Sequence, residues 1–439
     1  MLILAASTQR TIGLVIAIIV AGGFALYVLM NIFAGRKEIG AEIELAPNRK
    51  PYFDDETLET KRLDLSLAAG VGTLAIISLG LPLYWLGEPG RQEGLVDHSI
   101  GLWTEDGAEA FEEACSSCHG GGGAGGIAPY ALTTTQGEFI ASVDWVAPSL
   151  TSVLTRFDED EVRFILNWGR NGVMPAWGAP GGGPLTVQQI DIIITYLRSI
   201  QKDGEAVQDA VNEGLIQGAR DEFVAQDPEL SQRLREAGTA LTSAQQSGVA
   251  RLIEEAEAAL SEVEREIGEQ FPDGAMAAYV DQLASATPGS DDYLLYGKLL
   301  FTNRADSGAY GCARCHTNGW SYDGANDLDI DGEPLNTLPD GTPGHVQGGG
   351  WFGPNLTGGA TVEQFPNEDD MVTFIQTGSS VGTRYGVAGQ GDGQMPGFGV
   401  RVDDDLLEID EFGEEVSKNW PASLTEEQIR AIVAYERSL

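Results

Sequence analysis

The sequence predicts an all-α protein: two N-terminal transmembrane helices, then two similar helical domains joined by a charged helical linker. Three observations support this prediction. Two long apolar runs lie in the first 90 residues, a set of short motifs recurs in both halves of the remainder, and the stretch between the halves is rich in Ala and Glu. The predicted divisions are 1–90 for the membrane anchor, 91–200 for the first domain, 201–289 for the linker and 290–439 for the second domain.

The composition is that of a folded, strongly acidic protein. The chain has 439 residues, 42% of them hydrophobic, which is enough for several cores. It carries 26 Lys and Arg against 66 Asp and Glu, a formal net charge of -40. Such a surface repels nucleic acid, so DNA or RNA binding is a poor hypothesis. The charge suits either docking to a basic partner or solubility at high salt, and the sequence does not separate the two.

The two apolar runs are each long enough to cross a membrane. They occupy about 11–33 and 65–86, and a helix needs about 20 residues to span the hydrocarbon core. A buried core helix and a cleaved signal peptide are the alternatives. A signal peptide carries its positive charge ahead of a shorter apolar run, whereas here Arg36 and Lys37 follow the first run. We therefore expect two retained membrane helices.

The charges of the loop between these runs predict their orientation. The loop, residues 36–62, is rich in Lys and Arg, whereas the outer flanks offer only Arg10 and Arg91. By the positive-inside rule this loop is cytoplasmic. Both termini, and everything after about residue 90, are then expected on the outer side of the cell membrane.

All four cysteines of the chain lie in two copies of one pentapeptide. CSSCH contains Cys115, Cys118 and His119, and CARCH contains Cys312, Cys315 and His316. In C-x-x-C-H, two thiols one helical turn apart add to the vinyl groups of a haem, and the adjacent His reaches the iron. A disulfide, a zinc site or a thioredoxin-like pair does not need His directly after the second Cys. The motifs therefore predict two covalently bound haem c groups, which are attached outside the cytoplasm.

Each pentapeptide is followed by the same series of segments, so the chain contains a duplicated domain. The first repeat continues with APSL (147–150), FILNWGRNGVMPAWG (164–178) and LTVQQIDIIITYLRSI (185–200). The second continues with GPNLT (353–357), MVTFIQTG (371–378), GQMPGFG (393–399) and LTEEQIRAIVAYERSL (424–439). The matching segments are separated by loops of unequal length.

A second axial ligand for each iron is expected from the M-P segments. Met174 and Met395 lie in this context between a C-x-x-C-H and the last helix of the repeat, and a thioether ligand raises the haem potential. Met371 competes in the second repeat, but its helix-like stretch aligns with Phe164 and we interpret it as core. His345 is the rival ligand for the second haem.

The remaining segments position these ligands. Pro148 and Pro354 open equivalent P-x-L turns, whose carbonyl groups are placed to accept the ring N–H of each ligand His. The last helix of each repeat, here called the closing helix, begins with Thr186 or Thr425 as N-cap. Thr425 has Gln428 three residues on, as in a capping box.

A short helix before each motif offers a small and an aromatic residue four positions apart. Because residues four positions apart share one helix face, this pair allows the short helix to cross the closing helix closely. A Tyr of the closing helix then packs into the space left by the glycine. The residues are Gly107, Phe111 and Tyr196 in the first repeat, and Gly297, Phe301 and Tyr435 in the second.

With these motifs, residues 104–200 and 290–439 each closely resemble the class I cytochrome c family. The resemblance implies a small helical bundle around each haem, with the Cys pair holding the haem, His and Met as axial ligands, and the Pro carbonyl accepting the bond from the His. These roles fall on Cys115, Cys118, His119, Pro148 and Met174, and on Cys312, Cys315, His316, Pro354 and Met395.

The pair of domains also resembles the di-haem cytochrome c subunit of actinobacterial-type cytochrome bcc quinol reductase complexes. That resemblance implies cytochrome b, a Rieske protein and a haem-copper oxidase as partners. The anchoring differs, because here two apolar runs precede the haem domains and none follows them.

Two regions lie outside this pattern. In the linker, Asp227 and Pro228 form a helix start, and an apolar stripe runs from Val249 to Ile267. The stripe is typical of a helical hairpin packed on its own domains, although a docking arm for another subunit would look the same.

In the second repeat, the segment DLDIDGEP contains Asp327, Asp329 and Asp331, which match the first positions of a calcium-binding loop. The acid expected at the twelfth position is Leu338, so a solvated acidic loop is the alternative.

Two functional classes remain open. The first is an electron relay in a respiratory chain, part of a quinol:cytochrome c reductase/oxidase assembly. The second is a haem enzyme or dehydrogenase subunit with one open iron, as in a peroxidase, which requires a displaceable axial ligand and a distal acid or base. A Met candidate for each iron favours the relay, and no catalytic residue is predicted.

Overall fold

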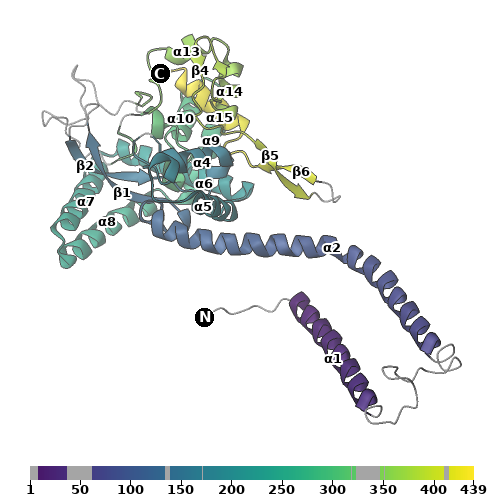
Figure 1. Ribbon diagram of the computed structural model, residues 1–439. Helices are drawn as coiled ribbons and strands as arrows, with labels where there is room; N and C mark the ends of the chain where they lie inside the picture. The colour runs from purple at the N-terminus through teal and green to yellow at the C-terminus, as the bar shows by residue number, and fades with distance from the viewer. Residues whose placement is uncertain are drawn as a thin grey trace, which may run out of the picture. The chain divides into compact units, whose positions relative to one another are not determined.

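The structure is a computed structural model that describes residues 8–36, 62–133, 139–170, 172–317, 319–322, 347–350, 352–409 and 415–439 (Figure 1). The chain divides into two compact units, Met1–Glu93 and Gly94–Leu439, which are described separately below. The predicted calcium loop with Asp327, Asp329 and Asp331 lies outside the described residues, as does His345.

The N-terminal unit consists of two helices. Helix α1 spans Thr8–Arg36, and α2 spans Leu63–Ala114, of which the residues up to Glu93 belong to this unit. Within α2, Leu63–Glu88 is long and apolar enough to cross a membrane, with a mean hydropathy of 1.8 and no side chains buried in the protein. In α1 the apolar stretch, Ile18–Met30, is shorter. One described helix thus has the length and composition of a membrane span, and the pair of spans stays a prediction.

The first repeat forms a small core around the end of α2. It contains α3 (Ser116–His119), β1 (Gly126–Thr133), β2 (Phe139–Ala147), α4 (Glu159–Trp168) and α5 (Val187–Ser199), with short 3₁₀ turns at Gly121–Gly123, Val153–Thr155 and Ala179–Gly181. The predicted apolar positions of the closing helix α5, Ile190, Ile193, Ile194 and Leu197, are all buried in this core. Trp420, far along the chain, packs in the same cluster.

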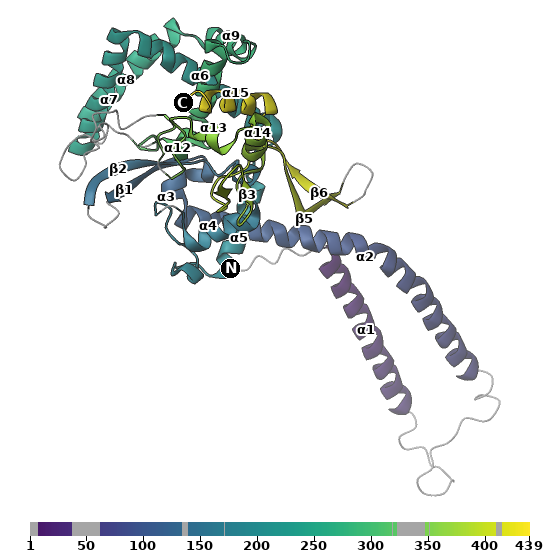
Figure 2. The ribbon, with the colours of Figure 1, turned by 90° about the horizontal axis from the view of Figure 1, so that it is seen from above.

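The linker forms four helices: α6 (Gly204–Gln226), α7 (Pro228–Ser247), α8 (Ala250–Gln270) and α9 (Asp273–Ala284). Helix α7 begins where Asp227 and Pro228 predict, with the Asp227 carboxylate accepting from two backbone N–H groups. Helices α7 and α8 lie side by side (Figures 1 and 2) and share a small cluster that includes Val263 and Ile267. Val249 and Leu252, at the other end of the stripe, are exposed.

Helices α6 and α9 pack against the second repeat rather than against α7 and α8 alone. Val211, Leu215 and Leu283 are fully buried in the same cluster as the core of that repeat. Of the two interpretations left open for the linker, packing on its own domains therefore describes α6 and α9, while α7 and α8 bury apolar surface mainly on each other.

The second repeat has the same order of helices with longer insertions. It contains α10 (Asp291–Phe301), α11 (Ala305–Gly308), α12 (Ala313–His316), α13 (Ala360–Gln364), α14 (Glu368–Thr377), β3 (Arg384–Tyr385), β4 (Gly389–Gln390), β5 (Arg401–Ile409), β6 (Glu415–Trp420) and α15 (Glu426–Glu436).

The described chain is mostly helical, but it is not all-α. Strands β1 and β2, β3 and β4, and β5 and β6 form three antiparallel two-stranded sheets. They occupy the loops between the matching segments, which the prediction left unassigned. In β2 the burial alternates, with Val143, Trp145 and Ala147 buried, because successive side chains of a strand point to opposite faces.

Candidate haem sites

The first motif sits on the turn that follows α2. The backbone N–H of His119 donates to the carbonyl of Cys115 at 2.9 Å, so both cysteines and the histidine lie on one short helical turn. His119 is buried, and its Nδ1 lies 2.9 Å from the carbonyl oxygen of Pro148. Because Nδ1 is held by this hydrogen bond, Nε2 is the nitrogen left to coordinate a metal.

The second motif repeats this geometry. The N–H of His316 donates to the carbonyl of Cys312 at 3.0 Å, and Nδ1 of His316 lies 2.9 Å from the carbonyl oxygen of Pro354. Gly353 lies directly against the imidazole, since a Cβ there would be 2.5 Å from His316 Cε1. Only glycine fits this close approach of the P-x-L turn to the ring.

Burial keeps these groups neutral. It lowers the pKa of His119 and of His316, so both imidazoles are uncharged and able to act as ligands near neutral pH. It raises the pKa of the Cys115 thiol to about 11, and it raises the pKa of Cys312 and Cys315 as well. A redox pair or a zinc site works through thiolates, which these surroundings disfavour.

The structure gives no support to the other uses of the cysteines. All four are free of disulfide bonds. Among the described residues there is also no group of three or more His, Cys, Asp or Glu side chains placed to hold a metal ion. In each motif, two cysteines on one helical turn beside an imidazole whose Nε2 is left for a metal fit a covalently attached haem.

Each predicted methionine packs against the core that contains its motif. Met174 lies against the cluster with Cys115, and Met395 lies against the cluster with Cys312. The loops that carry them are held in the same way. The N–H of Arg170 donates to the carbonyl of Met174 at 2.9 Å, and the N–H of Ser379 donates to that of Met395 at 2.9 Å.

A glycine makes each of these loops possible, and the sequence analysis missed it. Gly169 and Gly378 end α4 and α14 with φ of 76° and 73°. A Cβ at either position would meet the carbonyl oxygen of Met174 or Met395, at 2.4 and 2.6 Å. The signal was present in the sequence, because both glycines directly follow the helix that precedes the M-P segment.

Met371 is a core residue, as predicted, but its alignment with Phe164 was wrong. Met371 is 3% exposed in α14, whereas Phe164 is 62% exposed in α4. The correct alignment of α4 with α14 comes from a hydrogen bond that both repeats share. The N–H of Trp177 donates to the carbonyl of Leu166, and the N–H of Phe398 donates to that of Ile375, so Leu166 corresponds to Ile375. This register places Met371 opposite the buried Val162.

The predicted helix crossing occurs in both repeats. A Cβ at Gly107 would lie 2.1 Å from the carbonyl oxygen of Ile192 in α5, and one at Gly297 would lie 2.1 Å from that of Ala431 in α15. The aromatic partners also meet. The ring centroids are 5.2 Å apart for Phe111 and Tyr196, and 5.5 Å apart for Phe301 and Tyr435.

The caps of the closing helices are as predicted, with one addition. Thr425 and Gln428 form the expected capping box at α15. Thr186 forms the same box with Gln189 at α5, a pairing that the sequence analysis did not note. Both closing helices therefore start at a fixed residue.

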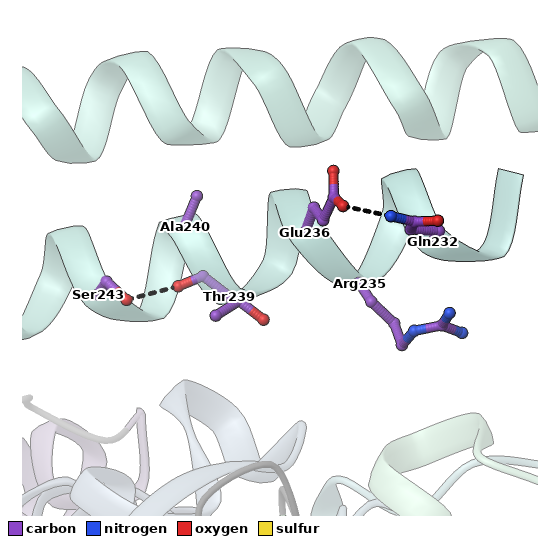
Figure 3. Close-up of a pocket in the computed structure, with 6 residues that line it drawn as sticks. All are labelled: Gln232, Arg235, Glu236, Thr239, Ala240 and Ser243. Atoms are coloured by element: carbon purple, nitrogen blue, oxygen red, sulfur yellow. Dashed lines mark hydrogen bonds between the residues drawn. The ribbon is translucent and has the colours of Figure 1, made fainter. Parts of the chain in front are cut away.

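The pocket drawn in Figure 3 lies away from these sites. Its lining side chains all come from α7, in the linker: Gln232, Arg235, Glu236, Thr239, Ala240 and Ser243. It contains none of the predicted ligands, and hydrogen bonds along one helix, such as Gln232 to Glu236, occupy its polar groups. The candidate sites are therefore identified by the two Cys and His motifs and their hydrogen bonds, and not by this pocket.

The geometry around His119 is that of a c-type cytochrome domain, which holds a covalently bound haem and transfers electrons through it. A comparison with protein families agrees: the family model described as cytochrome C oxidase, cbb3-type, subunit III matches residues 104–197. This match covers a minority of the chain and ends before the second motif. Neither a curated protein nor a solved structure matches the sequence.

Proposed function

We propose that the chain is a membrane-anchored di-haem c-type cytochrome that relays electrons in a respiratory chain. The observation that carries the proposal is the recurrence, around His316, of the contacts found around His119. The first contact is the hydrogen bond between the histidine Nδ1 and a proline carbonyl. The second is the helix crossing, which needs glycine because the two helices approach closely. The third is the backbone hydrogen bond to the carbonyl of the methionine.

The ligand roles follow from this repetition. Cys115 and Cys118 hold one haem and Cys312 and Cys315 the other. His119 with Met174, and His316 with Met395, occupy the axial positions, while Pro148 and Pro354 orient the two imidazoles. A haem iron closed on both faces supplies one-electron transfer and leaves no position for a substrate.

The proposed setting is the outer face of a cell membrane. The apolar part of α2 and the run in α1 anchor the chain, with the loop 36–62 cytoplasmic and both termini outside. The proposed role is that of a subunit in a quinol:cytochrome c reductase/oxidase assembly. Its partners there are cytochrome b, a Rieske protein and a haem-copper oxidase. Support for this setting comes from the apolar helix Leu63–Glu88 and from the resemblances stated above.

The first test is the haem content and the visible spectrum of the purified full chain. We expect two covalently bound haems per chain, a sulfur-to-iron band in the oxidised spectrum, and no spectral change when carbon monoxide is added to the reduced protein. One haem per chain would contradict the proposal. A carbon monoxide complex at half of the haem would instead favour the alternative, a haem enzyme or dehydrogenase subunit with one open iron.

Paired methionine variants assign the second axial ligand. Met395→Leu removes the thioether from the proposed ligand, so one of the two haems should then bind carbon monoxide. Met371→Leu is the matched control, because Met371 lies buried in α14 of the same repeat and has no proposed role at the iron. Carbon monoxide binding by the Met371 variant, and none by the Met395 variant, would reverse the assignment.

A further inference from the structure

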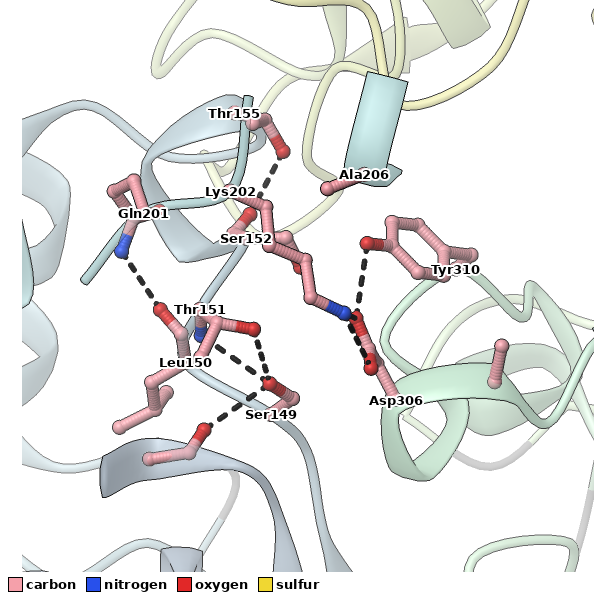
Figure 4. Close-up of polar contacts among 12 residues, drawn as sticks. Ser149, Leu150, Thr151, Ser152, Thr155, Gln201, Lys202, Ala206, Asp306 and Tyr310 are labelled. Carbon is pink, nitrogen blue, oxygen red and sulfur yellow. Dashed lines mark hydrogen bonds and ion pairs between the residues drawn. The ribbon is translucent and has the colours of Figure 1, made fainter. Parts of the chain in front are cut away.

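The two repeats are joined through the turns that carry the proposed ligands. The N–H of Ser149, next to Pro148, donates to the carbonyl of Asp306 at 3.0 Å. Lys202 forms an ion pair with Asp306 at 2.6 Å, and the hydroxyl of Tyr310 donates to the same carboxylate at 3.1 Å (Figure 4). Asp306 and its neighbour Ser307 have φ of 50° and 57°, a strained backbone held at this contact.

Arg314 reaches from the second motif into the first repeat. It is the third residue of CARCH, between Cys312 and Cys315, yet its Nη2 donates to the carbonyl of Val146 at 2.6 Å. Its Nη1 donates to the carbonyl of Ser307 at 3.0 Å. Val146 lies two residues before Pro148, so the guanidinium is adjacent to the turn that orients His119.

Two more arginines lie in the same place, both from the first repeat. Arg156 and Arg170 approach the ring of Phe157, with guanidinium carbons 5.8 and 4.6 Å from its centroid. Arg156 is 8% exposed, and it donates a long hydrogen bond, 3.4 Å from Nε to the carbonyl oxygen of Ser152. Arg170 donates to the carbonyl of Gln394, the residue before Met395.

Arg156 is buried and Arg170 and Arg314 are half-buried, and in the described part of the chain none of the three guanidinium groups is hydrogen-bonded to a carboxylate. Their described hydrogen-bond partners are backbone carbonyls. The carboxylates near them are bound by other groups: Asp306 by Lys202 and Tyr310, Glu161 by the N–H of Asp158, and Asp392 by the N–H of Gln394 and the hydroxyl of Ser379. Burial lowers the pKa of Arg156 and of Arg314 to about 10, and the charge of Arg170 lowers both further. Like charges gathered away from water need an anion, and arginine matches a carboxylate with two parallel bonds.

The position of the cluster indicates which haem supplies that anion. In a haem, the two pyrroles that form the thioethers lie opposite the two that carry the carboxylates. Arg314 stands between Cys312 and Cys315, while its guanidinium hydrogen-bonds to Val146 of the first repeat. Its place between these cysteines puts Arg314 at the thioether edge of the second haem, opposite the carboxylates of that haem, while its guanidinium reaches the first repeat. This location fits the carboxylate edge of the first haem.

We propose that Arg314, although part of the second haem motif, binds the carboxylates of the first haem across the boundary between the repeats, together with Arg156 and Arg170. This inference rests on the proposed function, since it requires both haems. In this arrangement the carboxylate edge of the first haem lies next to the thioether edge of the second haem. The side chain of Arg314 connects the two edges. The second repeat thereby sets the potential of the first haem.

The test is a redox titration of the full chain carrying Arg314→Gln. The two midpoint potentials are first assigned with Met174→His and Met395→His, each of which lowers the potential of its own iron. Removing a cation beside the first haem favours its oxidised form. We expect a tenfold change in its one-electron equilibrium constant, which is about 59 mV lower in potential. The second haem should move less.

Two variants control for charge and folding. Arg304→Gln removes an equal charge from an exposed side chain that stacks on Trp320 in the same repeat, and it should leave both potentials in place. Arg314→Lys keeps the cation and should restore most of the first haem's potential. If Arg314→Gln does not accumulate, Arg314→Met preserves the packing of the stem and carries the same expectation.

The outcomes separate this inference from the proposed function. A wild-type chain with fewer than two haems would overturn the proposed function and this inference together. Two haems with a larger shift at the second haem would show that Arg314 serves its own haem, and unchanged potentials would show that it serves neither. Either result overturns the inference alone.

Discussion

Replacing Gly107 with Ala should separate the two helices that close the first haem domain. Gly107 is buried in α2 where that helix crosses α5. A Cβ there would lie 2.1 Å from the carbonyl oxygen of Ile192 and 2.9 Å from Cβ of Tyr196. The first distance is about 1.3 Å short of the 3.4 Å at which ordinary contact begins. Since a backbone carbonyl cannot rotate away, the helices themselves must shift.

The magnitude follows from two opposing effects. Ala is favoured over Gly in a helix by about 1 kcal/mol. Overpacking a buried contact costs about 1–3 kcal/mol, and this contact, with backbone as the obstacle, belongs at the upper end. We expect Gly107→Ala to lower the free energy of unfolding by about 2 kcal/mol. Gly101→Ala, six residues earlier in α2 with nothing within 4 Å of its Cβ, should raise it by about 1 kcal/mol.

The assay is denaturant unfolding of both variants and the wild type, followed by far-ultraviolet circular dichroism and by the haem band of each variant. The pair isolates the crossing, because both changes are Gly to Ala in one helix. Equal stability of the Gly107 and Gly101 variants would refute the close crossing. A loss confined to the Gly107 variant, with the haem band perturbed at the same denaturant concentration, would support it.

Two other predictions concern the second repeat. Thr425→Ala should lower the free energy of unfolding by about 1 kcal/mol, because the Thr425 hydroxyl caps α15, whereas Thr373→Ala on the exposed face of α14 should change it little; thermal unfolding distinguishes them. Burial raises the pKa of Glu436 from 4.5 to about 8. Stability should therefore fall between those pH values, by up to about 1.4 kcal/mol per pH unit, and Glu436→Gln should flatten that fall in unfolding curves measured at pH 5 and pH 8.

Features that depend on neighbouring residues were predictable from the sequence. The order of Cys and His in each motif, the methionine beside a proline, and the capped starts of the closing helices are all short-range patterns. A hydroxyl three residues before a Gln predicted the α15 cap, and the same rule applied to Thr186 would have predicted the α5 cap. These patterns carry their structure because the hydrogen bonds that they form are local.

Features that join distant segments were not predictable in this way. The β1–β2 hairpin occupies a loop without a regular apolar period that signals strands, and its burial pattern includes the contact between Trp145 and Tyr322 in the second repeat. Trp420 enters the core of the first repeat from the second. Nothing near Arg314 in the sequence indicates that its side chain reaches Val146. Such contacts depend on how the two repeats pack against each other. Residue composition and hydrophobic periodicity do not predict that packing.

The distribution of charge connects the acidic surface with this internal contact. The chain has only 26 basic residues against 66 acidic ones, and Arg156, Arg170 and Arg314 lie between the repeats. Their burial leaves the surface more acidic than the composition alone indicates. An acidic exterior steers association with a basic carrier and is screened by salt. A cation held beside a haem carboxylate between the repeats, as we propose, would be screened far less and would act on the haem potential. On the function and the inference proposed above, the surface acids would govern encounter with a basic soluble electron carrier, and the three arginines would govern the driving force between the haems.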